Sequence, residues 1–283
     1  MYQQTGNAKR YCLYCLGWIL IFILVCASAQ SASLYEQSRQ KLESRLAGIQ
    51  QESYTFVVMG DSRDNDKIFI KCLLASARYR PLFILHTGDA VSTGSEEQFV
   101  HFLGILQQTL PDMPVFVAAG NHELTKREKS EKRKMLFQQL IGPLNYALDL
   151  PRINARCIVL DNSDYALTSN QIDYLNNQLA VDNSLNFVFM HIPPQTLKWI
   201  DSHTFTNGAD AFLQTLSGRS VAGVFYGHYH LYDEAMISGT RHIITGGAGA
   251  PLTRLYFGDP SYHFVVVTLS GGKVSTEKVL VSE

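Results

Sequence analysis

The feature that most constrains the fold is a series of short apolar runs, rich in Val, Ile and Phe, that recurs from Tyr54 onward. Continuous apolar runs are typical of strands covered on both faces, because neither face of such a strand meets water. Longer amphipathic segments separate the runs, and the spacing of their apolar residues predicts helices. This alternation indicates one layered α/β domain built on a pair of mixed sheets.

The length and pattern of each segment give the expected elements. Strands are predicted over residues 55–59, 82–86, 115–118, 157–160, 187–190, 221–226, 242–245 and 264–269. Helices are predicted over 65–79, 95–109, 128–140, 169–180 and 208–216. The helix over 128–140 is strongly charged, which is typical of a solvated face, although a lid over a substrate is an alternative. Beyond Ser217 the sequence predicts mainly strands and Gly-rich turns.

The N-terminus has the pattern of a secretory signal. Lys9 and Arg10 precede an apolar run over residues 11–26, which the small residues Ala27-Ser28-Ala29 follow. A positive segment, a short apolar run and a small-x-small site predict cleavage after Ala29. The apolar run is shorter than a bilayer span of about 20 residues, so an uncleaved anchor helix is the less favoured alternative.

These patterns divide the chain into three parts. Residues 1–29 are the predicted signal peptide, residues 30–53 are a polar, helix-compatible leader, and residues 54–283 form the predicted α/β domain. The predicted localisation is therefore outside the cytoplasm, either periplasmic or secreted. The mature chain has no predicted stable membrane span.

Charge and cysteine usage exclude several classes of protein. The formal net charge is −1 and the isoelectric point is near 6.7, so no nucleic-acid partner is indicated. A small phosphorylated molecule remains compatible with this balance. Cleavage would leave Cys72 and Cys157, and two cysteines make no disulfide framework in a domain of this size. Buried free thiols are favoured over a disulfide.

Polar groups follow five of the predicted strands directly. They are Asp61, Asp89, Asn121, His191 and the pair His228 and His230. Because ligands bind outside the carboxyl ends of strands in α/β sheets, we expect these residues to share one crevice. A mixture of carboxylate and imidazole ligands favours Zn, Mn, Fe or Ni. Each motif alone also has a structural explanation, such as a helix cap or a hydrogen-bonded histidine.

The ordered series GD-x-R, GD-x4-G, GNHE, a lone His and GHYH resembles the calcineurin-like metallophosphoesterase family over about residues 54–250. The segment LDNS, followed by TSNQIDYLNNQL, also resembles the stretch that precedes the lone His in that family. The resemblance implies a four-layer α/β/β/α sandwich with two stacked mixed sheets. It also implies two divalent metal ions as cofactors.

The resemblance further implies a role for each residue. Asp89 would bridge the two ions, Asp61 and His230 would hold the first, and the second would be held by Asn121, His191 and His228. His122 would contact the substrate phosphate, beside Asn121, and protonate the leaving oxygen. A hydroxide activated by the ions would attack phosphorus in line.

The first motif departs from the family pattern at one position. The family has D-x-H there, whereas this chain has Arg63, which offers no lone pair to a metal. Ser92 stands where purple acid phosphatases have a Tyr ligand, so their iron-phenolate variant is not supported. The first site would then be weaker, or Asp64 would complete it, or Arg63 would bind the substrate phosphate. We favour phosphate binding by Arg63, with an Arg–Asp brace beneath the site as the structural alternative.

The expected function is hydrolysis of a phosphomonoester or phosphodiester. The alternative is a non-catalytic, metal-binding recognition module whose first metal site is degraded. His122 speaks against the alternative, because a binder needs no proton donor. His86 is expected beneath the site or in the core, and Tyr229 is expected to point away and pack.

Overall fold

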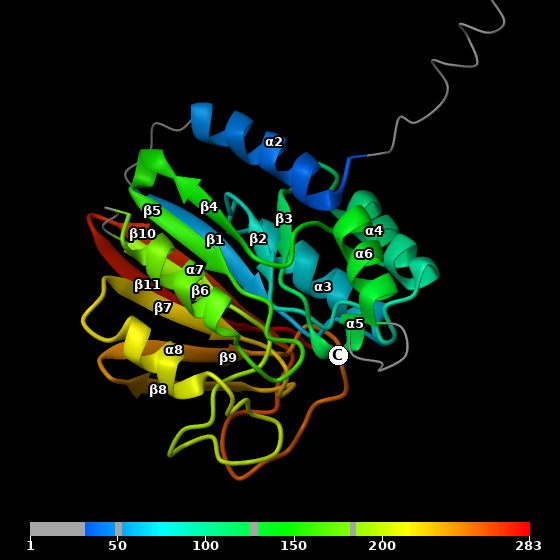
Figure 1. Cartoon of the computed structure of the whole chain (residues 1–283). Helices are drawn as coiled ribbons and strands as arrows, with labels where there is room; N and C mark the ends of the chain where they lie inside the picture. Colours follow the sequence, from blue (N-terminus) through cyan, green and yellow to red (C-terminus); the bar gives the residue numbers. More distant parts are fainter. Residues whose placement is uncertain (1–31, 49–52, 125–129, 182–184) are drawn as a thin grey trace, which may run out of the picture. The chain divides into compact units, whose positions relative to one another are not determined.

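Two mixed β-sheets stack face to face in the unit Ser33–Glu283 (Figure 1). In the first sheet the strand order is β11-β10-β1-β2-β3, and β1, β2 and β3 are parallel. Its strands are β1 (Ser53–Met59), β2 (Ile84–His86), β3 (Val115–Val117), β10 (His263–Ser270) and β11 (Lys273–Leu280). In the second sheet the order is β4-β5-β6-β7-β9-β8. Its strands are β4 (Tyr146–Leu150), β5 (Ala155–Val159), β6 (Leu185–Phe189), β7 (Val221–Tyr226), β8 (Tyr232–Ile237) and β9 (Thr240–Thr245).

Helices cover the outer face of each sheet. The first sheet is covered by α3 (Asp66–Ala77), α4 (Glu96–Thr109) and α6 (Ser130–Leu140). The second is covered by α7 (Ser169–Leu179) and α8 (Ala209–Leu216). Short helices begin after β3 and β4, namely α5 (Asn121–Leu124) and η1 (Pro151–Ile153). The structure therefore confirms the predicted four-layer α/β/β/α sandwich.

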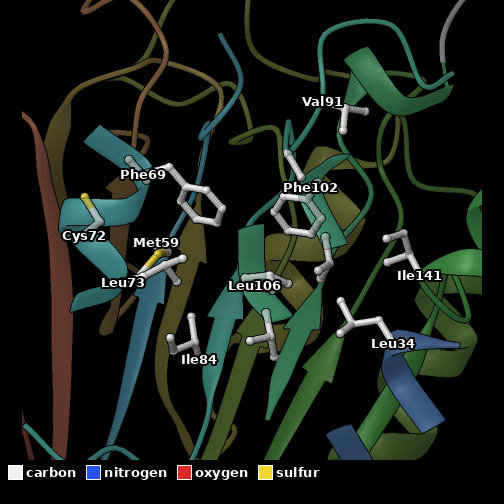
Figure 2. Packing of buried hydrophobic residues seen from close by; sticks show 14 of the residues in the cluster. Leu34, Met59, Phe69, Cys72, Leu73, Ile84, Val91, Phe102, Leu106 and Ile141 are labelled. Atoms are coloured by element: carbon white, nitrogen blue, oxygen red, sulfur yellow. The ribbon is translucent and has the colours of Figure 1, made fainter. Parts of the chain in front are cut away.

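Burial on both faces explains the continuous apolar runs. In β1, Phe56 and Val58 face the second sheet, whereas Val57 and Met59 face the helices. Figure 2 shows Met59 packed with Phe69 and other residues of the helical side of this core. Three apolar clusters result, one between the sheets and one beneath each helical layer.

The structure contains three strands that the sequence did not predict. β4, β8 and β11 all lie at sheet edges, where one neighbour is missing. In β8 and β11 exposed positions alternate with less exposed ones, and both strands contain charged residues, so neither forms a continuous apolar run. β11 is identified only by its pairing with β10, because tertiary pairing and not local composition fixes an edge strand.

The predicted leader contains α2 (Leu34–Ala47), which belongs to the same unit as the sheets. Ser33 and Glu36 form a capping box at its N-terminus, which satisfies free backbone N–H groups. The Ser38 hydroxyl accepts from the Val115 amide at 2.9 Å and donates to the Val115 carbonyl at 2.8 Å. Leu42 enters the core between the sheets, so α2 seals the edge beside β3.

The described residues are 32–48, 53–124, 130–181 and 185–283. The predicted signal over 1–29 lies outside them, and so do parts of the leader and of the charged segment. Within the described ranges, none of the helices combines the length and apolar character needed to cross a bilayer. Cys72 and Cys157 are buried free thiols, as predicted.

Phe187 provides a test of the contact between the sheets. Its ring packs 5.1 Å from that of Phe56, edge to face, and is fully buried. We expect Phe187→Ala to lower the free energy of unfolding by about 3–5 kcal/mol, because it removes apolar contacts and leaves a cavity. Urea denaturation measures the loss. Val100→Ala, at a half-exposed α4 position, is the control and should change stability by less than about 0.5 kcal/mol.

Candidate metal centre

The structure brings the predicted site residues together at the carboxyl ends of five strands. Asp61 follows β1, Asp89 follows β2 and Asn121 follows β3, while His191 follows β6 and the pair His228 and His230 follows β7. The site residues include two groups, and within each group the candidate ligand atoms all lie within 4.8 Å of one another. One is Asp89, His191 and His228, and the other is Asp61, Asp89 and His230. Asp89 belongs to both groups, so the two candidate ion positions are adjacent.

Backbone strain is concentrated in these loops. The φ angles are +58° at Asp61, +54° at Asp89, +73° at His228 and +46° at His230. Residues with a Cβ rarely adopt this left-handed region, and such conformations persist only where the surroundings hold them. The loop of Asp61 is held by its carbonyl, which accepts from the Ala250 amide at 2.7 Å. The strain therefore fixes side-chain directions at the centre.

Close approach of the backbone explains two of the glycines. A Cβ on Gly120 would lie 2.2 Å from Asp89 Oδ1, and one on Gly227 would lie 2.4 Å from Asp61 Oδ2. Both distances are far below a normal contact, so a side chain at either position would displace a carboxylate. The glycines before the polar groups keep these carboxylates in place.

His191 presents a lone pair to the centre. Its Nδ1 donates to the Thr87 carbonyl at 2.9 Å, which in the neutral ring leaves Nε2 unprotonated. Nε2 lies 3.2 Å from Asp89 Oδ1, 3.1 Å from Asn121 Oδ1 and 3.2 Å from His228 Nδ1. These atoms bring lone pairs to one point, which a cation between them would stabilise. The donor set therefore fits a divalent metal ion.

The other two imidazoles are also held by polar partners. The Nδ1 of His230 donates to the Pro251 carbonyl at 2.8 Å, and its Nε2 lies 3.4 Å from Asp61 Oδ1. The Nε2 of His228 lies 3.2 Å from the Tyr165 hydroxyl. Partners of this kind orient metal-ligating histidines and fix which nitrogen faces the ion.

Burial and charge act in opposition at the centre. Burial disfavours a charged His191, but the carboxylates around it, Asp89 first, raise its pKa to about 9. Burial likewise opposes charge on Asp89, but His191 and His122 hold the pKa of that carboxyl below its ordinary value. His228 has a lowered pKa because of burial and of the charge of His191. An environment that favours a positive charge between Asp89 and these rings also favours a cation.

Glu123 is a site residue for which the sequence pattern predicted no role. Its fully buried carboxylate accepts from the backbone amides of Asp89 at 2.9 Å, Val91 at 2.9 Å and Gly120 at 2.7 Å. Burial and the charge of Asp89 raise the pKa of Glu123 to about 7. The carboxylate thus ties the loop after β2 to the loop after β3. Its place at the end of GNHE was the available signal.

Asn162 is a second residue with no predicted role. Its Oδ1 accepts from the amides of His191 and Ile192, both at 3.1 Å, and its Nδ2 donates to the Ile192 carbonyl at 2.6 Å. These bonds fix the turn that carries His191. The LDNS segment, which contains Asn162, was the corresponding sequence signal.

Arg63 lies beside the centre, in contact with acidic groups. Its Nη1 donates to Asp64 at 2.5 Å, and its Nε lies 3.6 Å from Asp89 Oδ2. That Nε is buried and makes no hydrogen bond to the described residues. Asp64 is absent from both ligand groups and instead binds Arg63 and the Ser92 hydroxyl. The contacts include the predicted Arg–Asp brace and leave the Nε of Arg63 without a hydrogen bond among the described residues.

His122 projects from α5 into a cavity beside the candidate ligands. Its Nδ1 donates to the Ser92 carbonyl at 2.8 Å, and its Nε2 lies 3.9 Å from Asp89 Oδ2. Its side chain is one-third exposed, so the ring reaches solvent in the cavity. The cavity has a volume of about 330 Å³ and is also lined by Arg63 and His230.

His86, His203, His242 and Tyr229 lie at different distances from the candidate ligands. His86 is buried beside the centre, where its Nε2 contacts Ser62 Oγ at 3.0 Å, and burial lowers its pKa to about 3. Tyr229 packs in the core beneath the second helical layer, although its ring also borders the cavity. His242 is bonded to the Tyr226 hydroxyl in that core and does not line the cavity. His203 lines the cavity, which the sequence did not predict.

Solved structures share this fold. They include a purple acid phosphatase from yellow lupin, with a TM-score of 0.66 and 15% identity over 81% of this chain and 52% of that chain. A second is GAP50, described as the anchor in the inner membrane complex of Plasmodium, with a TM-score of 0.63 and 17% identity. The match covers 81% of this chain and 85% of GAP50. A third is a dimetal phosphatase from Danio rerio, with a TM-score of 0.58 and 16% identity. The match covers 80% of this chain and 95% of that phosphatase. At these identities the likeness shows the fold alone.

Sequence comparison gives the family. A curated protein of Fibrobacter succinogenes, described as a probable cyclic nucleotide phosphodiesterase, is 26% identical over 149 residues. That match spans 51% of this chain and only 56% of the relative. The family model described as calcineurin-like phosphoesterase matches residues 54–232, which is more than half of the chain. The chain therefore belongs to the calcineurin-like phosphoesterase family.

Proposed function

We propose that this chain is a metal-dependent hydrolase of phosphomonoesters or phosphodiesters. The observation that carries the proposal is the pair of ligand groups that share Asp89. Asp61, Asp89 and His230 would hold one ion, and Asp89, Asn121, His191 and His228 would hold the second. Bound divalent ions supply positive charge for the phosphoryl oxygens and lower the pKa of water at the site.

His122 is the proposed proton donor to the leaving oxygen. The Ser92 carbonyl holds its Nδ1, so the ring presents Nε2 to the cavity. His122 belongs to neither candidate ligand group, so its ring is available for proton transfer. Asn121 precedes His122 in α5. A substrate phosphate would therefore lie between the proton donor and the ligand set.

Arg63 is proposed to bind a phosphate oxygen. Its guanidinium lines the cavity, and its Nε has no hydrogen-bond partner among the described residues. A guanidinium donates in a fixed fork that matches a phosphate. This role does not require Arg63 to replace the ligand that the family has at this position.

A non-catalytic binding module is the second candidate. The observation that favours it is the group Asp61, Asp89 and His230, beside which the cationic Arg63 lies 3.6 Å from Asp89 among the described residues. The Plasmodium neighbour GAP50, described as an anchor, has the same fold, so the fold does not decide between catalysis and binding. His122 in the cavity favours catalysis.

Turnover of chromogenic phosphate esters separates these candidates. After chelation, adding Mn²⁺ or Zn²⁺ should restore hydrolysis of a monoester or a diester. Asp89→Asn should abolish metal uptake and activity, because both ligand groups lose their shared carboxylate. His122→Ala should retain metal uptake but reduce kcat by about 10²- to 10⁴-fold, which is typical of a lost acid–base group.

The matched control is Asp259→Asn, which removes an exposed carboxylate that pairs with Lys278 and belongs to neither ligand group. It should keep both the metal content and the activity of the original chain. A metal-loaded protein that hydrolyses neither ester would contradict the hydrolase proposal and favour the binding module. Metal content is measured by elemental analysis and ester hydrolysis by absorbance.

Arg63→Met tests the phosphate contact. We expect KM to rise by about 10- to 100-fold, since a hydrogen bond to a charged group contributes about 1.5–3 kcal/mol. Metal affinity should stay close to that of the original chain. If metal affinity falls while KM is unchanged, Arg63 is a brace for Asp89 and not a phosphate ligand.

Export is also proposed, on the basis of the sequence before Gln30. N-terminal sequencing of the protein secreted by a bacterial host tests it. A mature chain that starts at Gln30 is the expected result, because cleavage follows the small residue Ala29. A chain retained in the membrane fraction with its N-terminus intact would instead support the anchor alternative.

A further inference from the structure

The cavity has two sides, defined by the ligand that the lining residues contact. On the first side, Arg63 and His122 lie within 3.9 Å of Asp89. On the second side, the ring centroids of Tyr165 and His203 lie within 5.9 Å of that of His228, and Tyr229 and Leu255 also line the cavity. None of Tyr165, His203, Tyr229 and Leu255 belongs to a ligand group among the described residues. A phosphate at the first side would direct its organic group toward the second.

Tyr165 is fixed firmly at this second side. Its backbone has φ +59°, a conformation that residues with a Cβ rarely adopt. Its hydroxyl lies 3.2 Å from Nε2 of His228, and the two rings meet edge to face with centroids 5.4 Å apart. The ring therefore stands next to the proposed phosphate position and is half-buried.

His203 approaches from the connection between β6 and α8. Its ring centroid lies 5.9 Å from that of His228 and 6.0 Å from that of Tyr229, yet its side chain is 63% exposed. Asp201 pins this connection, because it accepts from the His203 amide at 2.7 Å and from the Tyr229 hydroxyl. A ring held at the cavity and left largely exposed offers a free face to a ligand.

The loop after β9 extends the same surface. Leu255 lines the cavity and is 38% exposed, and its neighbour Tyr256 is 76% exposed. The Tyr256 ring packs on Phe257, which packs on Tyr229 with centroids 5.3 Å apart. This loop and the one that carries His203, orange and yellow-green in Figure 1, both contact Tyr229. Rings and apolar groups thus continue from the cavity to its rim.

We propose that this ring-bearing side binds the planar aromatic group of the phosphate ester, such as a nucleobase. The inference rests on the proposed function, which it narrows to esters of nucleosides and other aryl or heteroaryl groups. Rings recognise a flat π-system by stacking and need no matching charge. A cavity of about 330 Å³ is at the small end of sites for organic ligands, so it suits a mononucleotide and not a polymer.

Adenosine 5′-monophosphate and ribose 5-phosphate test this inference, because they differ only in the base. With the metal-loaded chain, we expect KM and the calorimetric Kd to be about 5- to 150-fold lower for the nucleotide, as one stacked base contributes about 1–3 kcal/mol. His203→Ala should remove most of this preference by raising the KM for the nucleotide. His203→Phe, which keeps a planar ring, should retain it.

His101→Ala is the control for loss of an exposed histidine. His101 pairs with Asp66 and lines a separate cavity of about 190 Å³ on the other side of Arg63. It should keep the preference for the nucleotide. Equal KM and Kd values for the two ligands, or a preference lost in His101→Ala but kept in His203→Ala, would overturn the inference. Tighter nucleotide binding without turnover of either ester would uphold the inference while contradicting the proposed hydrolase.

Discussion

The buried carboxylate of Asp89 is the group on which the site depends. It contributes to both candidate ligand groups, and its Oδ1 accepts from the His122 amide at 3.0 Å. Its own amide donates to Glu123, which also holds Gly120. A charge buried this deeply is stable only when charged and polar partners surround it. The ends of β2 and β3 are therefore arranged around one anion.

The two stacked sheets make this arrangement possible. Parallel strands in both sheets end at the same side, so loops from β1, β2 and β3 meet loops from β6 and β7. Inter-sheet aromatic packing around Phe56 gives the loops a rigid base. Strain at Asp61 and His228 is tolerated because this base and the cross-loop hydrogen bonds hold the backbone.

The fold and the site answer different questions about function. Membership of the calcineurin-like phosphoesterase family and the metal-compatible donor set support phosphoester chemistry. Arg63, Tyr165 and His203, the residues proposed to contact the ester, line the same cavity as the candidate ligands. Such residues vary independently of the fold, because substrate contacts lie on loops and not on the layers that support them.

The sequence by itself determined the α/β class, the strands buried on both faces and the polar residues that follow them. Local signals sufficed there, since a strand covered on both faces must be apolar and a sharp turn beside a carboxylate needs glycine. Only the tertiary structure decided the edge strands β4, β8 and β11, the role of Glu123 and the place of His203 in the cavity. These features depend on partners distant in sequence, and no local pattern of residues encodes which segments will meet.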